Sequence, residues 1–270
     1  MPKPQPGPRE GWRAGMRALA RDPRIHCKLS GLLTELSPEE RRDPLPALQG
    51  TLADLLDWFG PDRLIYITCE NSAKVVVIDP GTNKVIEALD SGSTNGHRLI
   101  IAPDGSRLYT ENEEDATVSV IDLKTRKLTG KIKTPRPLAG IAISPDGKTV
   151  VAVDDAEPAL FLIDTASERV RDEVRLKDVP KAAQIARYAP DWSLLGVTSL
   201  NSDTVSLIDP SFKEQTAIKV GNQPMDMAFH GDELFVPCQG DGSVHVIDIP
   251  NRKHKTSFKC GTGCESIGFF

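Results

Sequence analysis

The dipeptide Ile-Asp recurs five times along this chain, and its periodicity constrains the fold more than any other feature of the sequence. The aspartates of the five copies are Asp79, Asp122, Asp164, Asp209 and Asp248, which gives spacings of 43, 42, 45 and 39 residues. Repeats of this length are typical of propeller blades and of helical solenoids. Each unit contains short β-branched runs bounded by Asp, Pro and Gly turn signals, a texture that favours strands. The repeat therefore predicts successive four-stranded sheets.

The second unit serves as a template, with strands A to D reading "RLIIA", "RLYTE", "TVSVID" and "LTGKI". The first unit begins at its strand B, "RLIYITC", and the last residues, "ESIGFF", read as an unpaired strand A. A propeller closes into a ring and so covers its edge strands. We therefore predict a mainly β fold, a five-bladed β-propeller over residues 63–270 closed by the C-terminal strand, with a short α-helical appendage at the N-terminus.

The units "YITCENSAKVVVIDPGTNKV", "APDGSRLYTENEEDATVSVIDLKTRKL" and "SPDGKTVVAVDD" resemble the YVTN family of β-propeller repeats. The resemblance covers about residues 63–270, and Tyr66 to Cys69 best match the motif that names the family. Members of that family more often have seven blades. Five units leave open a small closed ring, an open arc, or a ring completed by a second chain.

Residues 12–62 carry no trace of the repeat. The segment "WRAGMRALARDP" has helical spacing, Ser37 to Glu40 form a capping box with Pro at the first helical position, and "LPALQGTLADLLDWFG" predicts a second amphipathic helix. The Pro-rich residues 1–11 are expected to be disordered. With a strand between the first helix and Ser37, the order is helix, strand, helix, which is typical of α/β proteins.

The strings "IHCKLSGLLTEL" and "LADLLDWFGPDRLIY" resemble the C-terminal end of metal-dependent TIM-barrel amidohydrolases. In that family the last barrel strand leads into Gly-Ser-Asp-Trp-Pro, whose Asp serves the active site. Here the strand continues into residues 67–71, "ITCEN", so the catalytic Asp is missing, as are the HxH-type ligands. Amidohydrolase chemistry is therefore not transferred. The fragment, from a fusion or a library junction, is expected to pack on the propeller rim, to be partly disordered, or to mediate a homodimer through Leu52, Leu55, Leu56 and Trp58.

Composition excludes several classes of partner. The chain has 270 residues, a formal net charge of −5 and interspersed acidic and basic residues, so it offers no basic stripe to nucleic acid. No apolar run approaches the roughly 18 residues of a membrane span, and the N-terminus lacks the apolar core of a signal peptide. We expect no membrane partner and a cytoplasmic location. Five unevenly placed cysteines are expected to be reduced.

The loops at one mouth of a propeller are where ligands bind by fold analogy. This placement predicts a catalytic set of His97, Glu111 and Asp154. A small-molecule ligand is predicted to contact Arg98, Asn112, Lys181, Asn201, Gln239 and Glu265. Because hard cations prefer about 6–8 oxygen ligands, Glu70, Glu111, Asp154 and Asp226 predict a Ca²⁺ site. The alternative is that these acidic residues cap turns and solvate the surface.

The cysteine thiols suggest a second candidate metal site. Cys69 and Cys238 occupy the same position in the first and fifth units, and Cys264 begins the predicted closing strand. With His97 these three thiols are predicted to hold Zn²⁺, or two of them to form a disulfide if oxidised. The alternative is that they are small buried side chains that fill tight strand ends.

Two functions follow from these residues. The first is a promiscuous metal-assisted hydrolase of small activated esters, lactones or phosphotriesters at the channel mouth, with His97 as a proton carrier near neutral pH. The second is a non-catalytic platform that binds a ligand or a protein.

Overall fold

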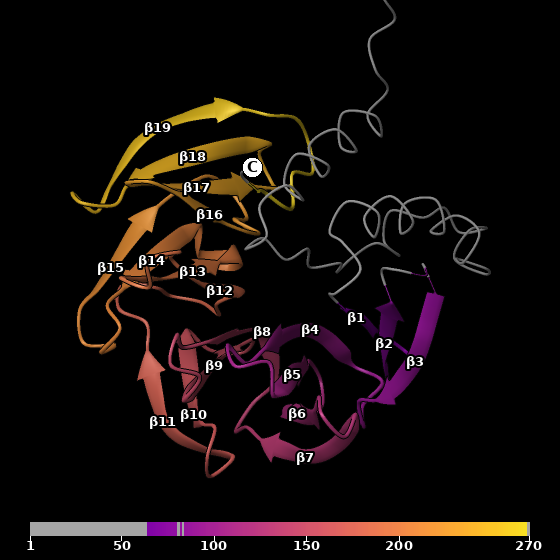
Figure 1. Ribbon diagram of the computed structural model, residues 1–270. Coiled ribbons are helices and arrows are strands. Elements are labelled where there is room, and N and C mark those ends of the chain that lie inside the picture. The colour runs from indigo at the N-terminus through magenta and orange to yellow at the C-terminus, as the bar shows by residue number, and fades with distance from the viewer. Residues whose placement is uncertain (1–63, 80–81, 83, 269–270) are drawn as a thin grey trace, which may run out of the picture. The chain divides into compact units, whose positions relative to one another are not determined.

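The computed structural model describes residues 64–79, 82 and 84–268 (Figure 1). These residues divide into two compact units. The first unit contains the first sheet, and the second contains residues 70–73 and the chain from residue 91 onward. The helices predicted within residues 12–62, the dimer contact through them, and the disorder predicted for residues 1–11 lie outside the described residues. The mainly β prediction is confirmed for the described part, where almost every element is a strand.

The first unit contains a three-stranded antiparallel sheet. Its strands are β1 (Ile65–Cys69), β2 (Lys74–Asp79) and β3 (Lys84–Asp90). In register, Ile65 pairs with Ile78 and Cys69 pairs with Lys74. Among the described residues this sheet has no strand A, and β1 corresponds to the predicted strand B.

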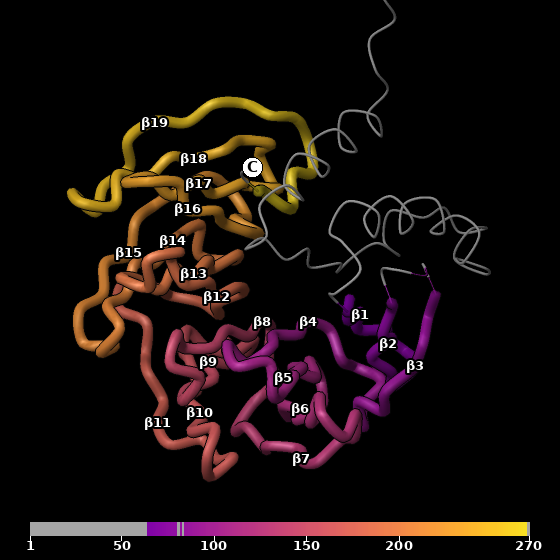
Figure 2. Tube along the Cα trace, viewed as in Figure 1, coloured from indigo at the N-terminus to yellow at the C-terminus, as the bar shows by residue number. Residues whose placement is uncertain are grey.

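The second unit contains four antiparallel sheets of four strands, and in each the strands follow one another in chain order (Figure 2). The first sheet has β4 (Gly96–Ile101), β5 (Arg107–Asn112), β6 (Thr117–Asp122) and β7 (Lys127–Lys133). The second has β8 (Leu138–Ile143), β9 (Thr149–Asp154), β10 (Ala159–Asp164) and β11 (Arg169–Arg175). The third has β12 (Ile185–Tyr188), β13 (Leu195–Ser199), the 3₁₀ turn η2 (Leu200–Ser202), β14 (Thr204–Ile208) and β15 (Gln215–Lys219). The fourth has β16 (Ala228–His230), β17 (Glu233–Cys238), β18 (Ser243–Asp248) and β19 (Lys253–Lys259).

The repeated Ile-Asp dipeptide lies at the end of the strand that precedes the last strand of each sheet, and its two residues have different tasks. Ile121 and Ile163 are fully buried, while the following aspartates accept hydrogen bonds from the turn. The Asp164 carboxylate accepts the backbone N–H (2.7 Å) and the hydroxyl (2.6 Å) of Ser167. These bonds to the ionised form lower the pKa of Asp164. The dipeptide therefore couples a core contact to a capped turn, which explains its recurrence.

Successive sheets of the second unit pack their apolar faces together. Val120 and Tyr109 share one buried cluster with Phe161 of the next sheet, and Val153 shares another with Val197 of the sheet after that. The first strands of neighbouring sheets also touch, with β8 in contact with both β4 and β12 (Figure 1). Small side chains permit this approach, because a Cβ on Gly140 would lie 2.6 Å from the carbonyl oxygen of Gln184. The strands β4, β8 and β12, each the first strand and one edge of its sheet, therefore lie beside one another; we call this edge of the sheets the inner edge.

The predicted closing strand is wrong over Glu265–Gly268, which form no strand. Gly261 and Gly263 have positive φ angles of 124° and 72°, and they turn the chain directly after β19. The backbone N–H of Ile267 then donates to the Asp226 carboxylate at 3.4 Å instead of entering a ladder. None of the five sheets is closed by the described residues, in which no helix is long and apolar enough to cross a membrane.

Candidate functional site

The last residues of β5, β9 and β17, which are Asn112, Asp154 and Cys238, were predicted to present ligands at the mouth. All three side chains are fully buried, as is that of Ser199, the last residue of β13. Side chains alternate between the two faces of a strand, so a residue at a strand end points into the sheet interface as readily as into a loop region. These residues occupy equivalent positions at the ends of their strands, and each is buried there.

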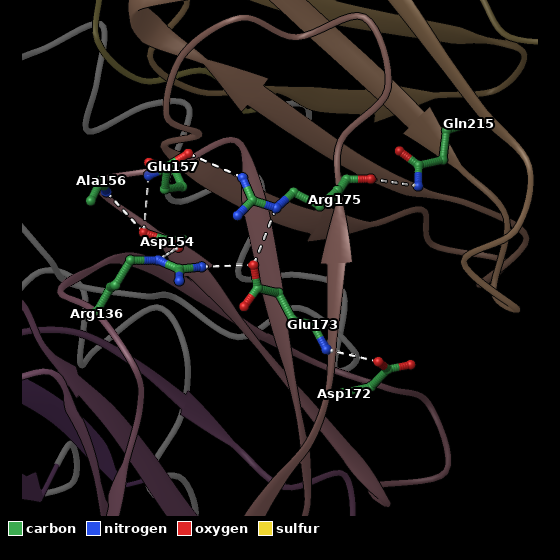
Figure 3. A network of polar contacts seen from close by, with 8 residues as sticks. All are labelled: Arg136, Asp154, Ala156, Glu157, Asp172, Glu173, Arg175 and Gln215. Carbon is green, nitrogen blue, oxygen red and sulfur yellow. Dashed lines mark hydrogen bonds and ion pairs between the residues drawn. The ribbon is translucent and has the colours of Figure 1, made fainter.

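Asp154 shows this most clearly, because both of its carboxylate oxygens are already used (Figure 3). One oxygen accepts the backbone N–H groups of Ala156 (2.9 Å) and Glu157 (3.1 Å). The other accepts the Nε–H of Arg136 at 2.5 Å. Arg136 also contacts Glu173 at 2.8 Å, and its guanidinium carbon lies 5.0 Å from the centre of the Phe161 ring. Asp154 therefore holds Arg136 and the backbone that follows β9, and its catalytic role stays a prediction.

Asn112 has a comparable task in the preceding sheet. Its amide nitrogen donates to the hydroxyls of Thr117 (2.8 Å) and Ser119 (2.9 Å), and the Ser119 hydroxyl donates to the carbonyl of Ser91 at 2.6 Å. These groups are buried, and the network satisfies the Asn112 amide nitrogen, whereas Asn112 Oδ1 is buried without a hydrogen-bond partner among the described residues. The predicted ligand contact of Asn112 stays a prediction.

His97 and Glu111, both predicted as catalytic, lie in contact at the inner edge of the second unit. His97 Nδ1 is 3.3 Å from Glu111 Oε1 and 3.2 Å from Glu113 Oε1, while Nε2 is 3.8 Å from Glu70 Oε1. Glu111 is fully buried and also accepts the backbone N–H of Arg98 at 3.0 Å. Its second oxygen, Oε2, is buried without a hydrogen-bond partner.

These contacts change the ionisation of both groups. Hydrogen bonds to Glu111 and then Glu113 raise the pKa of His97 to about 9, against the opposing effect of burial. Burial raises the pKa of Glu111, although His97 opposes that shift. A raised pKa favours the charged imidazolium at neutral pH, in which both ring nitrogens are hydrogen-bond donors. The role of His97 as a proton carrier stays a prediction.

Arg98 of β4, Arg187 of β12 and the buried Asp226 form what we call the inner arginine cluster. Arg98 donates its Nε–H to the carbonyl of Ala139 on β8 at 3.2 Å. Arg187 Nη2 lies 2.8 Å from Asp226 Oδ1. Burial lowers the pKa of Arg98, the charges of Glu111 and then Asp226 oppose that effect, and the charge of Arg187 adds to it. Three strands of three sheets therefore bring two guanidinium groups within electrostatic reach of each other.

Arg187 was not among the predicted residues. It is exposed between the buried Ala186 and the half-buried Tyr188, on a strand that forms the inner edge of its sheet. A charged residue on such a short apolar strand is the signal that could have identified it, but the pairing with Asp226, 39 residues away, could not be deduced from local sequence.

The remaining predicted ligand residues lie apart from this cluster. Lys181 donates its backbone N–H to Ser202 Oγ at 3.0 Å, Gln239 donates its backbone N–H to the Gln223 carbonyl at 2.9 Å, and the side chains of Asn201 and Glu265 are exposed. Among residues 84–268, no hydrogen bond or ion pair joins these four to Arg98 or Glu111. A surface cleft lies elsewhere, between the turns at Asp104 and Asp146, and no predicted site residue lines it.

The thiols are only partly brought together. Cys264 Sγ lies 3.6 Å from the Cys238 carbonyl, whereas the Cys238 thiol is buried and donates to the Val236 carbonyl at 3.6 Å. Burial raises the pKa of Cys238 to about 12, which disfavours the thiolate that a metal requires. Cys69 belongs to the first unit, so its place relative to the other two is not described. The predicted Zn²⁺ site with His97 is not formed among the described residues.

The predicted Ca²⁺ site does not fit the structure either. Asp154 is bound by Arg136, Asp226 by Arg187, and Glu111 by His97, so the carboxylates that would ligate a cation are neutralised by side-chain cations. Within the described part of the chain, no group of three His, Cys, Asp or Glu side chains is arranged to hold a metal ion. We therefore derive no chemistry through a metal at this site.

Comparison with known proteins separates the two ends of the chain. Residues 1–67 match the amidohydrolase family. The L-fucono-1,5-lactonase of Burkholderia ambifaria is 42% identical over 60 residues, and that of Burkholderia multivorans is 44% identical over 57 residues. These matches cover 22% and 20% of this chain, and 20% and 19% of the lactonases. The N-terminal segment is thus related to a fragment of an amidohydrolase, and the chain spans about a fifth of those relatives.

Two solved structures are similar in fold to the described part. A chain of hydrazine synthase from Kuenenia stuttgartiensis aligns with a TM-score of 0.56 and 23% identity, over 68% of this chain and 59% of that one. A protein of unknown function from Desulfotomaculum acetoxidans aligns with a TM-score of 0.62 and 13% identity, over 73% and 66%. At these identities the likeness concerns the fold alone. Assignment to the YVTN repeats remains a prediction.

Proposed function

We propose that the second unit is a binding platform for a small anionic ligand, held by the inner arginine cluster. One observation carries this proposal: Arg98 and Arg187 converge from two sheets, and each commits one side-chain nitrogen to protein, Arg98 to Ala139 and Arg187 to Asp226. No hydrogen bond among the described residues uses their other guanidinium nitrogens. Guanidinium groups bind carboxylates and phosphates through paired N–H donors, so two of them favour such an anion.

The surroundings support the same role. Ala139 and Gly140 of β8 leave little side-chain bulk between the strands that carry the two arginines. Charged His97 contacts one oxygen of Glu111 and one of Glu113, which offsets part of the negative charge beside the guanidinium groups. We further propose that the five sheets form the ring of a five-bladed propeller, whose inner strands would surround this ligand.

Titration calorimetry of the full chain with inorganic phosphate and with gluconate, a hydroxy acid, tests the proposal. We expect one anion to bind, and Arg98→Met or Arg187→Met to weaken it about tenfold, since a hydrogen bond to a charged group contributes about 1.5–3 kcal/mol. Arg175→Met is the matched control, because Arg175 is exposed and pairs with Glu157. Absence of binding by both anions, or equal affinity in all three variants, would refute the proposal. Melting curves identify variants that fail to fold.

Hydrolysis of a small activated ester, lactone or phosphotriester at the same place is the second candidate. It is favoured by the contact between His97 and Glu111, which makes a charged proton donor of the imidazole. The likeness of residues 1–67 to lactonases adds a reason to assay lactones first. Turnover that is lost in His97→Gln and is retained in Asp154→Asn would distinguish this function from binding alone.

A further inference from the structure

Cys260 and Cys264 lie directly after β19 with their sulfur atoms 2.8 Å apart. This separation exceeds the length of a disulfide bond, roughly 2.0 Å, by only about 0.8 Å. Gly261 and Gly263 lie between them, and both adopt the positive φ angles that bend the segment back on itself. The two thiols therefore face each other across a tight turn.

The turn is anchored to the adjacent β17–β18 connection. The carbonyl oxygen of Gly242 accepts the backbone N–H of Cys260 at 3.0 Å and that of Gly261 at 3.4 Å. Gly242 itself has a φ of 63°, and a side chain there would collide with the carbonyl of Gly261. This close backbone contact holds the thiols near each other before any bond forms, which lowers the entropy lost on ring closure.

We propose that Cys260 and Cys264 are a redox modification site that closes to an intramolecular disulfide by exchange with a small-molecule disulfide. The Cys260 thiolate attacks one sulfur of the oxidant, forming a mixed disulfide and releasing one thiolate. The Cys264 sulfur, after losing its proton to solvent, attacks Cys260 and displaces the second thiolate. The two cysteines lose two electrons and two protons, and the oxidant becomes two thiols.

The order of attack follows from exposure. Cys260 is exposed and reaches the oxidant first, whereas Cys264 is half-buried against the carbonyls of Gly261 and Cys238. Burial, and then the contact with Cys260, raise the pKa of the Cys264 thiol, so ring closure is expected to accelerate with rising pH. Cys238 is fully buried and stays reduced in the folded protein.

Trypsin digestion makes this bond directly measurable. Cleavage after Lys259 releases Cys260–Phe270 with both cysteines, while Cys238 falls in the separate peptide Val220–Arg252. The full-length protein is equilibrated in glutathione buffers of increasing disulfide fraction, quenched, alkylated in denaturant and digested. We expect Cys260–Phe270 to lose two hydrogens and escape alkylation, and Val220–Arg252 to remain alkylated. Reduction before alkylation should restore both labels.

Two variants keep the proposal falsifiable. Cys264→Ser is expected to retain a glutathione adduct on Cys260, because the resolving thiol is gone, and Cys238→Ser is expected to close the same bond as the parent. A persistent adduct on Cys260 in the parent protein would overturn the proposal. So would a bond between Cys260 and any other cysteine, or unmodified thiols at disulfide fractions that fully oxidise an unfolded Cys260–Phe270 peptide.

Discussion

The second unit contains two fully buried carboxylates that are each paired with a cation, and they differ in how many of their oxygens are satisfied. Asp154 and Glu111 are both fully buried. Asp154 uses both oxygens, on two backbone N–H groups and on Arg136. Glu111 uses Oε1 for His97 and for the Arg98 backbone, and Oε2 has no hydrogen-bond partner. Burial and pairing alone therefore do not distinguish a structural carboxylate from one with an oxygen that remains available to bind a ligand.

The largest effect is expected from Asp154→Asn. The substitution removes the negative charge that faces Arg136, and breaking one side of a buried ion pair costs several kcal/mol. Because Arg136 keeps Glu173, we expect the free energy of unfolding in urea to fall by about 3 kcal/mol. Glu157→Gln, at an exposed residue of the same network, is the control and should change it by about 0.5 kcal/mol or less. Equal effects of the two variants would contradict the structural role of Asp154.

An intermediate and pH-dependent effect is expected from Glu111→Gln. The pKa of His97 is raised from 6.5 to about 9, so its stabilisation is fully present below pH 6.5 and is lost as the pH rises through 9. Across that window the parent protein should lose about 2 kcal/mol of unfolding free energy, and the variant should lose much less because the largest cause of the shift is gone. Urea unfolding at several pH values between 6 and 10 measures both slopes. Parallel slopes would show that Glu111 does not hold His97 charged.

The smallest effect is expected from Glu113→Gln. Glu113 also contacts His97, at 3.2 Å, but its side chain is 47% exposed and solvent screens the interaction. Unfolding free energy at pH 7 should fall by about 0.5 kcal/mol. The pKa of His97, followed by NMR of the imidazole protons, should fall less than in Glu111→Gln. The exposed Glu114 supplies the control variant Glu114→Gln, and a larger drop for Glu113 than for Glu111 would reverse the ranking.

Much of the fold followed from short-range patterns. The template strands "RLYTE" and "TVSVID" correspond to β5 and β6, and within the described residues the first repeat begins at its strand B. The closing strand failed because its segment begins after two glycines that turn the chain and because Ile267 finds a partner in Asp226. Strand propensity in "ESIGFF" could not reveal that competing contact.

The candidate site was predictable only in part, for a similar reason. His97 and Glu111 were identified by their places beside a loop, and the structure brings them together. Asp154 and Asn112 were predicted from the same kind of position, yet Arg136 and Ser119 bind them inside the sheets. Which carboxylate or amide oxygen accepts a hydrogen bond depends on side-chain geometry, and the amino-acid sequence alone does not specify that geometry.

By itself, the sequence determined the repeating sheets and their capped turns, because strand alternation and Asp-based turns depend on residues only a few positions apart. Only the tertiary structure determines which charged side chains remain available to bind a ligand. Arg98 meets Ala139 across 41 residues and Arg187 meets Asp226 across 39. Such contacts arise when whole sheets pack together, and the packing of their apolar faces, rather than any local signal, sets the distances at which these side chains meet.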